Sequence, residues 1–177
     1  GLPVSIKEQV RMAGFDATCG VCCRLFEPAT EDAVLVATLK RAGAIPFART
    51  NVPQLCMLPE SFNAIYGVTS NPFDARRTPG GSSGGESALV AARASPLGLG
   101  TDIGGSIRIP AHFAGLVGFK PSVDRLSVKG VTVPRKGDRN GQVNIRSCPG
   151  PLARSVADAE LFMDACASKG SGMHESD

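Results

Sequence analysis

Short apolar stretches and longer helix-like stretches follow one another along the chain, which is the pattern of an α/β fold. The short stretches predict buried strands at 44–48, 96–101 and 117–119. The longer stretches predict helices at 30–42, 86–94, 106–114 and 155–167. Thr30 and Ser155 are expected to cap two of these helices, because a hydroxyl at that position can accept a free backbone amide.

Turn-forming residues dominate the segments between these elements. Residues 1–29 are predicted to be a loop-rich opening, and 49–80 an irregular but ordered loop dense in Asn, Pro and Gly. The region 122–150 is mostly polar loop, with a strand-like stretch at 131–133.

The composition is that of a globular protein. With 177 residues, of which 42% are hydrophobic, the chain can form one core, and we expect one domain over 1–169 and a flexible tail at 170–177. The net charge of +3 is too small to indicate a nucleic-acid partner. No apolar stretch reaches the roughly 18 residues of a membrane span. The start has neither an initiator Met nor a signal-peptide layout, so we expect a fragment of an intracellular protein.

The six cysteines are expected to be reduced thiols. Cys19, Cys22 and Cys23 are too close in sequence to bridge one another well. The Cys19-x-x-Cys22 pair has no second such pair, and only His112 and His174 could add imidazole ligands. We therefore expect no metal, and the sequence gives no signal for another cofactor.

Two glycine-embedded serine motifs carry the candidate chemistry: Gly80-Gly81-Ser82-Ser83-Gly84-Gly85 and Thr101-Asp102-Ile103-Gly104-Gly105-Ser106. A phosphate-binding P-loop is excluded, because Glu86 stands where a lysine is needed. The dinucleotide-binding pattern G-x-G-x-x-G does not match either, because the third glycine, Gly104, comes one position too late. The motifs instead favour a hydrolase, because a serine nucleophile needs backbone donors aimed at the oxyanion that it creates.

The nucleophile-elbow pattern G-x-S-x-G also matches, centred on Ser82 or Ser83. An elbow serine must follow a buried strand, whereas a polar loop precedes these serines. The base would have to be His112 or His174, of which one is very near in sequence and the other lies in the tail. A Ser-Ser-Lys arrangement that uses Lys7 as the base fits better.

The same motifs carry a family resemblance. The segments 80–86, 96–108 and 118–121 resemble the amidase signature family, and 5–8, 50–54 and 150–156 extend the likeness. The local sequence is most similar to the fatty-acid amide hydrolase branch of this family. The resemblance extends from Leu2 to about Cys166. The resemblance implies an amidase-signature fold in part: an α/β domain with a mixed, twisted β-sheet flanked by helices on both faces.

Residue roles follow from this resemblance. It implies that Ser106 is the nucleophile, that Ser82 is a bridging serine in a cis peptide setting, and that Lys7 is the base, with spacings of 75 and 24 residues along the chain. The oxyanion hole would be formed by the backbone amides of Ile103, Gly104, Gly105 and Ser106.

Other positions are assigned supporting or binding roles. Ser83, Thr101 and Arg108 are expected to support the site. Asp102 is expected to cap the following helix or pair with Arg108, although a role as general base stays open. Cys56 and Met57 either line the substrate pocket or pack in the core.

The function implied is hydrolysis of a small-molecule amide, with a lipid amide favoured, and without a cofactor. An aryl or small-molecule amidase, a glutamine amidotransferase subunit and a truncated, non-catalytic fragment remain alternatives. The resemblance further implies a homodimer for the full-length protein, and membrane association through segments absent from this chain.

Overall fold

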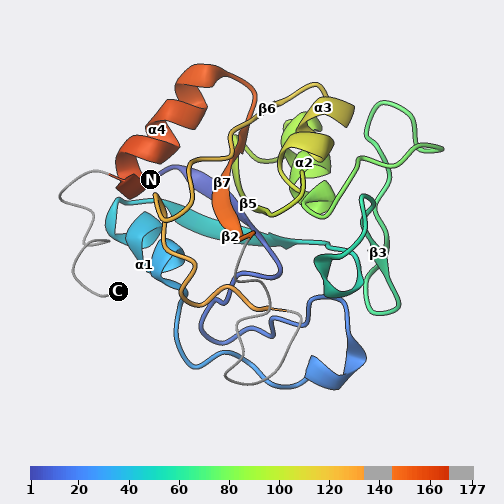
Figure 1. The fold of residues 1–177 in the computed structure, drawn as a ribbon, viewed down its shortest axis with the longest axis horizontal. Coiled ribbons are helices and arrows are strands. Elements are labelled where there is room, and N and C mark those ends of the chain that lie inside the picture. Colours follow the sequence, from blue (N-terminus) through green and yellow to red (C-terminus); the bar gives the residue numbers. More distant parts are fainter. Residues whose placement is uncertain (134–144, 168–177) are drawn as a thin grey trace.

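The computed structural model describes residues 1–133 and 145–167. Its centre is a five-stranded sheet in the order β2-β1-β5-β7-β6 (Figure 1). The strands are β1 (Pro3–Lys7), β2 (Ile45–Thr50), β5 (Leu97–Asp102), β6 (Val117–Gly118) and β7 (Cys148–Ala153). β1 is parallel to β2 and β5, whereas β7 is antiparallel to β5 and β6. The sheet is therefore mixed, as predicted.

Helices cover both faces of this sheet. They are α1 (Val34–Arg41), α2 (Gly84–Ala91), α3 (Arg108–Phe113) and α4 (Val156–Ala167). α1 and α4 pack together on one face, and α2 and α3 pack on the other. The remaining elements are two 3-10 turns, η1 (Cys22–Arg24) and η2 (Gln54–Cys56), and a small hairpin of β3 (Phe62–Asn63) and β4 (Gly67–Val68). This arrangement confirms the predicted fold class.

The two predicted helix caps had different outcomes. Ser155 Oγ accepts a hydrogen bond from the Asp158 amide at 3.1 Å, so the cap of α4 is confirmed. The cap at Thr30 is wrong, because α1 begins only after Ala33. Asp32, just before the helix, instead accepts a hydrogen bond from the Ala13 amide at 2.9 Å and ties an earlier loop to this end of α1.

Two strands of the sheet, β1 and β7, lie where loops were expected. Residues 4–7 of β1 are all buried, but Ser5 and Lys7 break its apolar pattern. β7 contains Pro149 and Pro151, and proline ordinarily argues against an interior strand because it has no amide to donate. Both strands lie next to β5, so the sheet is larger than the pattern predicted.

Two predicted strands differ from the expectation. β2 forms, but it is an edge strand and not a buried one: Ile45 and Phe47 are 55% and 49% exposed. The stretch 131–133 contributes only an isolated bridge between Val131 and Val10. The predicted tail at 170–177 lies outside the described residues.

The core has one part on each face of the sheet. The larger part joins Val4, Ile6, Leu97 and Leu99 of the strands to α1 and α4. The smaller part centres on Ile107, Ala111 and Leu152. Because β1 and β5 are parallel neighbours, their carboxyl ends meet at one edge, where polar groups can converge.

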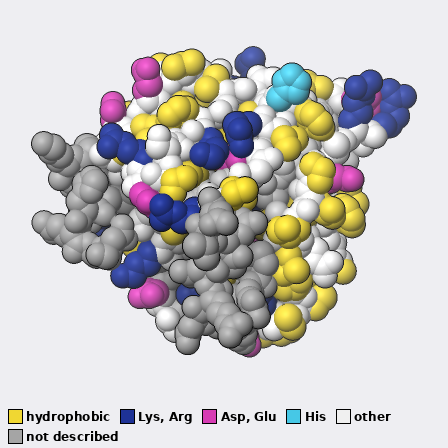
Figure 2. Space-filling view, viewed as in Figure 1, with side chains coloured by type: hydrophobic (Ala, Val, Ile, Leu, Met, Phe, Trp, Pro, Cys, Tyr) yellow, Lys and Arg dark blue, Asp and Glu magenta, His cyan; other side chains and the backbone are white. Residues whose placement is uncertain are grey.

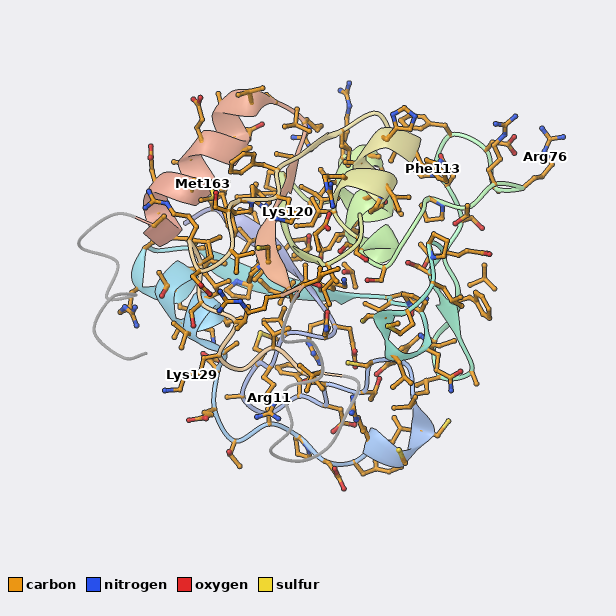
Figure 3. All side chains as sticks on the ribbon, viewed as in Figure 1. Arg11, Arg76, Phe113, Lys120, Lys129 and Met163 are labelled. Atoms are coloured by element: carbon orange, nitrogen blue, oxygen red, sulfur yellow. The ribbon has the colours of Figure 1, made fainter. Side chains whose placement is uncertain are left out.

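The surface around β3 and β4 is rich in apolar side chains. Figure 2 shows hydrophobic atoms gathered on the side of the molecule where Figure 1 places β3. The large exposed side chains of this region are Met57, Leu58, Phe62, Tyr66, Val68 and Phe73. Arg76, in the loop before α2, points away from the body of the molecule (Figure 3). Within residues 1–133 and 145–167, none of the helices has the length and apolarity needed to cross a membrane.

Candidate active site

Lys7 is the last residue of β1, and its side chain is fully buried. Its Nζ lies 2.7 Å from Ser82 Oγ and 2.7 Å from Thr101 Oγ1. Thr101 is in β5, the strand beside β1, and Ser82 lies in the loop before α2. The fold thus brings together a lysine and a serine that are 75 residues apart in sequence.

Burial favours the neutral form of Lys7. Loss of hydration lowers the pKa of this amine below its ordinary value of 10.5. Negative charge on Cys56, Cys19, Asp102 or Glu86 would act in the opposite direction, but burial outweighs it. The neutral amine has a lone pair and can accept a proton.

The first glycine-serine motif forms the loop that leads into α2. Its Gly81–Ser82 peptide bond is cis, as the family resemblance implied. Ser83 Oγ donates to the Thr101 carbonyl at 3.3 Å, and the Ser83 amide donates to the Ser106 carbonyl at 3.1 Å. Ser83 therefore holds the two motifs against each other, and its supporting role in catalysis stays a prediction.

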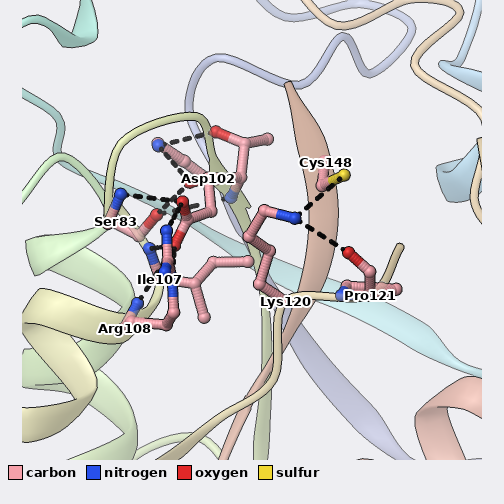
Figure 4. A network of polar contacts seen from close by, with 10 residues as sticks. Ser83, Asp102, Ile107, Arg108, Lys120, Pro121 and Cys148 are labelled. Carbon is pink, nitrogen blue, oxygen red and sulfur yellow. Dashed lines mark hydrogen bonds and ion pairs between the residues drawn. The ribbon is translucent and has the colours of Figure 1, made fainter. Parts of the chain in front are cut away.

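Asp102 organises the second motif from the end of β5 (Figure 4). Its buried carboxylate accepts hydrogen bonds from the amides of Gly105 at 2.8 Å and Ile107 at 3.0 Å. The Arg108 guanidinium adds two more, at 2.9 and 3.0 Å. These contacts fix the turn on which Ser106 stands, half-buried, between β5 and α3.

The environment of Asp102 decides between its two predicted roles. Burial raises the pKa of this carboxyl, but hydrogen bonds from Arg108 and from the amides of Ile107, Gly105 and Arg108 outweigh it and lower the pKa to about 2. A carboxylate that stays ionised at neutral pH and has all these partners is an anchor for the turn. A role as general base is not supported.

The predicted oxyanion hole lies on the same turn. Ile103 and Gly104 are exposed, so a substrate carbonyl can approach them. The Gly105 amide already donates to Asp102. A substrate oxygen would therefore be received mainly by the amides of Ile103, Gly104 and Ser106, and this assignment stays a prediction.

Gln9 is a site residue that the sequence did not indicate. Thr101 Oγ1 donates to Gln9 Oε1 at 2.8 Å, and Gln9 Nε2 donates to the Thr132 carbonyl at 2.8 Å. Because the Thr101 proton is given to Gln9, its oxygen must act as an acceptor toward Lys7. This leaves the lone pair of a neutral Lys7 for Ser82.

Glu86 is the second residue whose role was missed. Its carboxyl group is fully buried and accepts hydrogen bonds from Ser5 Oγ and Thr50 Oγ1, each at 2.5 Å. Burial raises the pKa of Glu86 to about 7, although Ser5, Thr50 and Lys7 act against it. The residue ties α2, and with it the Ser82 loop, to strands β1 and β2.

Cys56 and Met57 were both expected near the substrate. The Cys56 thiol is half-buried and interacts with Ser82 and Cys19, and its contact with substrate stays a prediction. Met57 is 65% exposed, which excludes core packing, and its contact with substrate stays a prediction.

The remaining candidate groups lie apart from this centre. His112 is exposed on α3 and packs near Phe113, while His174 lies outside the described residues. The described part of the chain contains no group of three His, Cys, Asp or Glu side chains that could hold a metal ion. A hollow of about 1010 Å³ lies beside β2; Phe15, Phe47 and Arg49 are among the residues that line it, and Ser82 and Ser106 are not.

Comparison with known proteins identifies the family. A family model described as Amidase matches residues 1–177. This chain belongs to the Amidase family. It is 50% identical over 161 residues to Amidase 2 of Gibberella moniliformis, and 47% identical over 165 residues to fatty-acid amide hydrolase 1 of Sus scrofa. These alignments cover 91% and 93% of the chain.

A solved structure of fatty acid amide hydrolase has the same fold as this Amidase chain. It superposes with a TM-score of 0.93 at 37% identity and covers 99% of the chain. The chain spans only about a third of the relatives it matches: 31% of the Gibberella protein, 28% of the pig protein and 30% of the solved structure.

Proposed function

We propose that the protein hydrolyses carboxylic amides through an acyl-enzyme on Ser106, with Ser82 and Lys7 as a proton relay. The observation that carries this proposal is the 2.7 Å contact between a fully buried Lys7 and Ser82. A buried neutral amine can take the Ser82 proton while Ser82 takes that of Ser106, which makes Ser106 nucleophilic.

The reaction then runs in two steps. Ser106 attacks the amide carbonyl, and backbone amides of the 103–106 turn stabilise the resulting oxyanion. The relay reverses and protonates the departing nitrogen, because an amine leaves poorly as an anion. Water hydrolyses the acyl-enzyme with the same groups acting as base.

We infer further that the acyl group is a fatty acid. The identity to fatty-acid amide hydrolase 1 and the exposed apolar side chains around Met57 support this substrate. A small-molecule amidase is the second candidate, because the identity to Amidase 2 of Gibberella moniliformis is as high. The homodimer, membrane association and intracellular location stay predictions.

The decisive experiment labels the intact protein with a fluorophosphonate probe. We expect labelling of Ser106 and its loss in Ser106→Ala. Labelling that persists in this variant and disappears in Ser83→Ala would favour the nucleophile elbow and overturn the proposal. Turnover of acyl amides of increasing chain length then separates the two substrate classes, since a rate that peaks at short chains excludes fatty-acid amides.

A further inference from the structure

Two thiols, those of Cys19 and Cys56, lie near the Lys7–Ser82 pair. The Cys56 thiol interacts with Cys19 and Ser82, while the Cys19 thiol donates a hydrogen bond to the Thr132 carbonyl at 3.8 Å. The loops that carry the two cysteines are joined by a hydrogen bond from the Leu55 amide to the Cys19 carbonyl, at 2.7 Å. The two cysteines are therefore on neighbouring loops, close to the proposed relay.

The two thiols differ in how well they can be reached. Cys19 is 1% exposed, whereas Cys56 is half-buried, so a small reagent can reach Cys56 first. The neighbouring Cys19 thiol lowers the pKa of Cys56, burial opposes this, and Lys7 lowers it further only while its amine is protonated. Cys56 thus has more thiolate character than a buried cysteine ordinarily has, and thiolate is the form that reacts with oxidants.

We propose that Cys56 and Cys19 form a peroxide-sensitive thiol pair whose disulfide switches the active site off. The Cys56 thiolate attacks one oxygen of hydrogen peroxide, the O–O bond breaks, and Cys56 sulfenic acid and hydroxide form. Cys19 sulfur then attacks Cys56 sulfur, the S–O bond breaks, and water leaves with the Cys19 proton. The two thiols lose two electrons in total, and the peroxide takes them up.

The expected consequence for activity rests on the proposed function. A disulfide removes the thiol proton and brings Cys56 sulfur to about 2.0 Å from Cys19 sulfur, away from its contact with Ser82. Ser82 then loses one of the groups that position its hydroxyl between Lys7 and Ser106. Small displacements of reacting groups cost about 10- to 100-fold in rate.

The test uses the intact protein with Cys22→Ala and Cys23→Ala, because trypsin leaves both residues in the same peptide as Cys19, residues 12–24. After treatment with hydrogen peroxide we expect mass spectrometry to find this peptide linked to residues 50–76, where Cys56 is the sole cysteine. Amide turnover should fall by about tenfold or more and return with dithiothreitol.

Two variants control this result. With Cys19→Ser, we expect no linked peptide and a loss of turnover that dithiothreitol does not reverse, because Cys56 oxidises further. Cys166→Ala, a buried cysteine in α4, should respond to peroxide as the parent does. Absence of the linked peptide, or full turnover by the linked protein, would overturn the proposal. A protein that forms the link but has no turnover before oxidation would instead contradict the proposed function.

Discussion

Lys7 Nζ lies 2.7 Å from Ser82 Oγ, and neither side chain is more than 1% exposed. A charged ammonium group in such a place would lose its hydration without gaining a carboxylate partner at hydrogen-bonding distance. The contact is therefore best understood as one between a neutral amine and a hydroxyl, which is what a proton relay needs.

Replacing Lys7 by alanine is expected to slow amide hydrolysis by about 10²- to 10⁴-fold, the usual contribution of a general base and acid. Ester hydrolysis should fall less, because an alkoxide needs less help from a proton when it leaves. The measurement is kcat/KM on a matched amide and ester with the same acyl group. Lys129→Ala is the control, since this lysine is exposed and projects away from the fold (Figure 3). Equal losses on both substrates would contradict the relay.

The activity should depend on pH through Lys7. The pKa of Lys7 in the folded protein lies below 10.5, and only the neutral amine can accept a proton. We therefore expect kcat/KM to fall about tenfold per pH unit below that pKa and to reach a plateau above it. Cys56→Ser should move this acidic limb to lower pH, because negative charge on Cys56 raises the pKa of Lys7. A limb that moves to higher pH would contradict this electrostatic assignment.

Much of the candidate site was predictable, because glycines mark the places where the backbone must pack closely or offer its amides to a ligand. The two glycine motifs indicated backbone donors and close packing, and β5 between them is buried along its whole length. Ser83 and Asp102 form hydrogen bonds within and between these motifs, and their supporting roles in catalysis stay predictions. The Amidase family match agrees with the resemblance that these motifs carried.

The missed features share one physical cause: polar or conformationally unusual residues inside the sheet. The polar residues Ser5 and Lys7 interrupt the apolar pattern that would have predicted β1. The two prolines of β7 argued against a strand there. Gln9 and Glu86 act through partners that are 92 and 81 residues away in sequence. No local pattern indicates such partners, because only the folded chain brings them together.

Gly105 and Gly104 are neighbours in the turn that carries Ser106, and alanine substitutions at the two positions can be compared to test how strictly this turn depends on its backbone conformation. Gly105 has a φ of +119°, and an added Cβ would lie 2.7 Å from Ile109 Cδ1, whereas a Cβ on Gly104 would meet no atom within 4 Å. Gly105→Ala should therefore destabilise the intact protein by about 1–2 kcal/mol or more. Gly104→Ala should leave the melting temperature nearly unchanged. Thermal unfolding followed by circular dichroism checks both, and equal shifts would show that the turn does not depend on this backbone conformation.

Glu86 should make the stability of the protein depend on pH. Its pKa is raised from 4.5 to about 7 in the fold, so the folded state binds more protons than the unfolded state between these values. The free energy of unfolding should therefore decrease as pH rises from 4.5 to 7, by at most about 1.4 kcal/mol per pH unit.

Glu86→Gln isolates this effect, because the amide keeps the shape of the side chain: its oxygen can accept from one of the two hydroxyls of Ser5 and Thr50, and its NH2 can donate to the other. Urea unfolding of the intact protein at pH 4.5 and 7.5 is expected to show that the variant gains stability relative to the parent at the higher pH. Glu160→Gln, an exposed position on α4, should show no such gain. If the stability difference between Glu86→Gln and the parent were the same at pH 4.5 and pH 7.5, the pKa of Glu86 would not be raised in the fold.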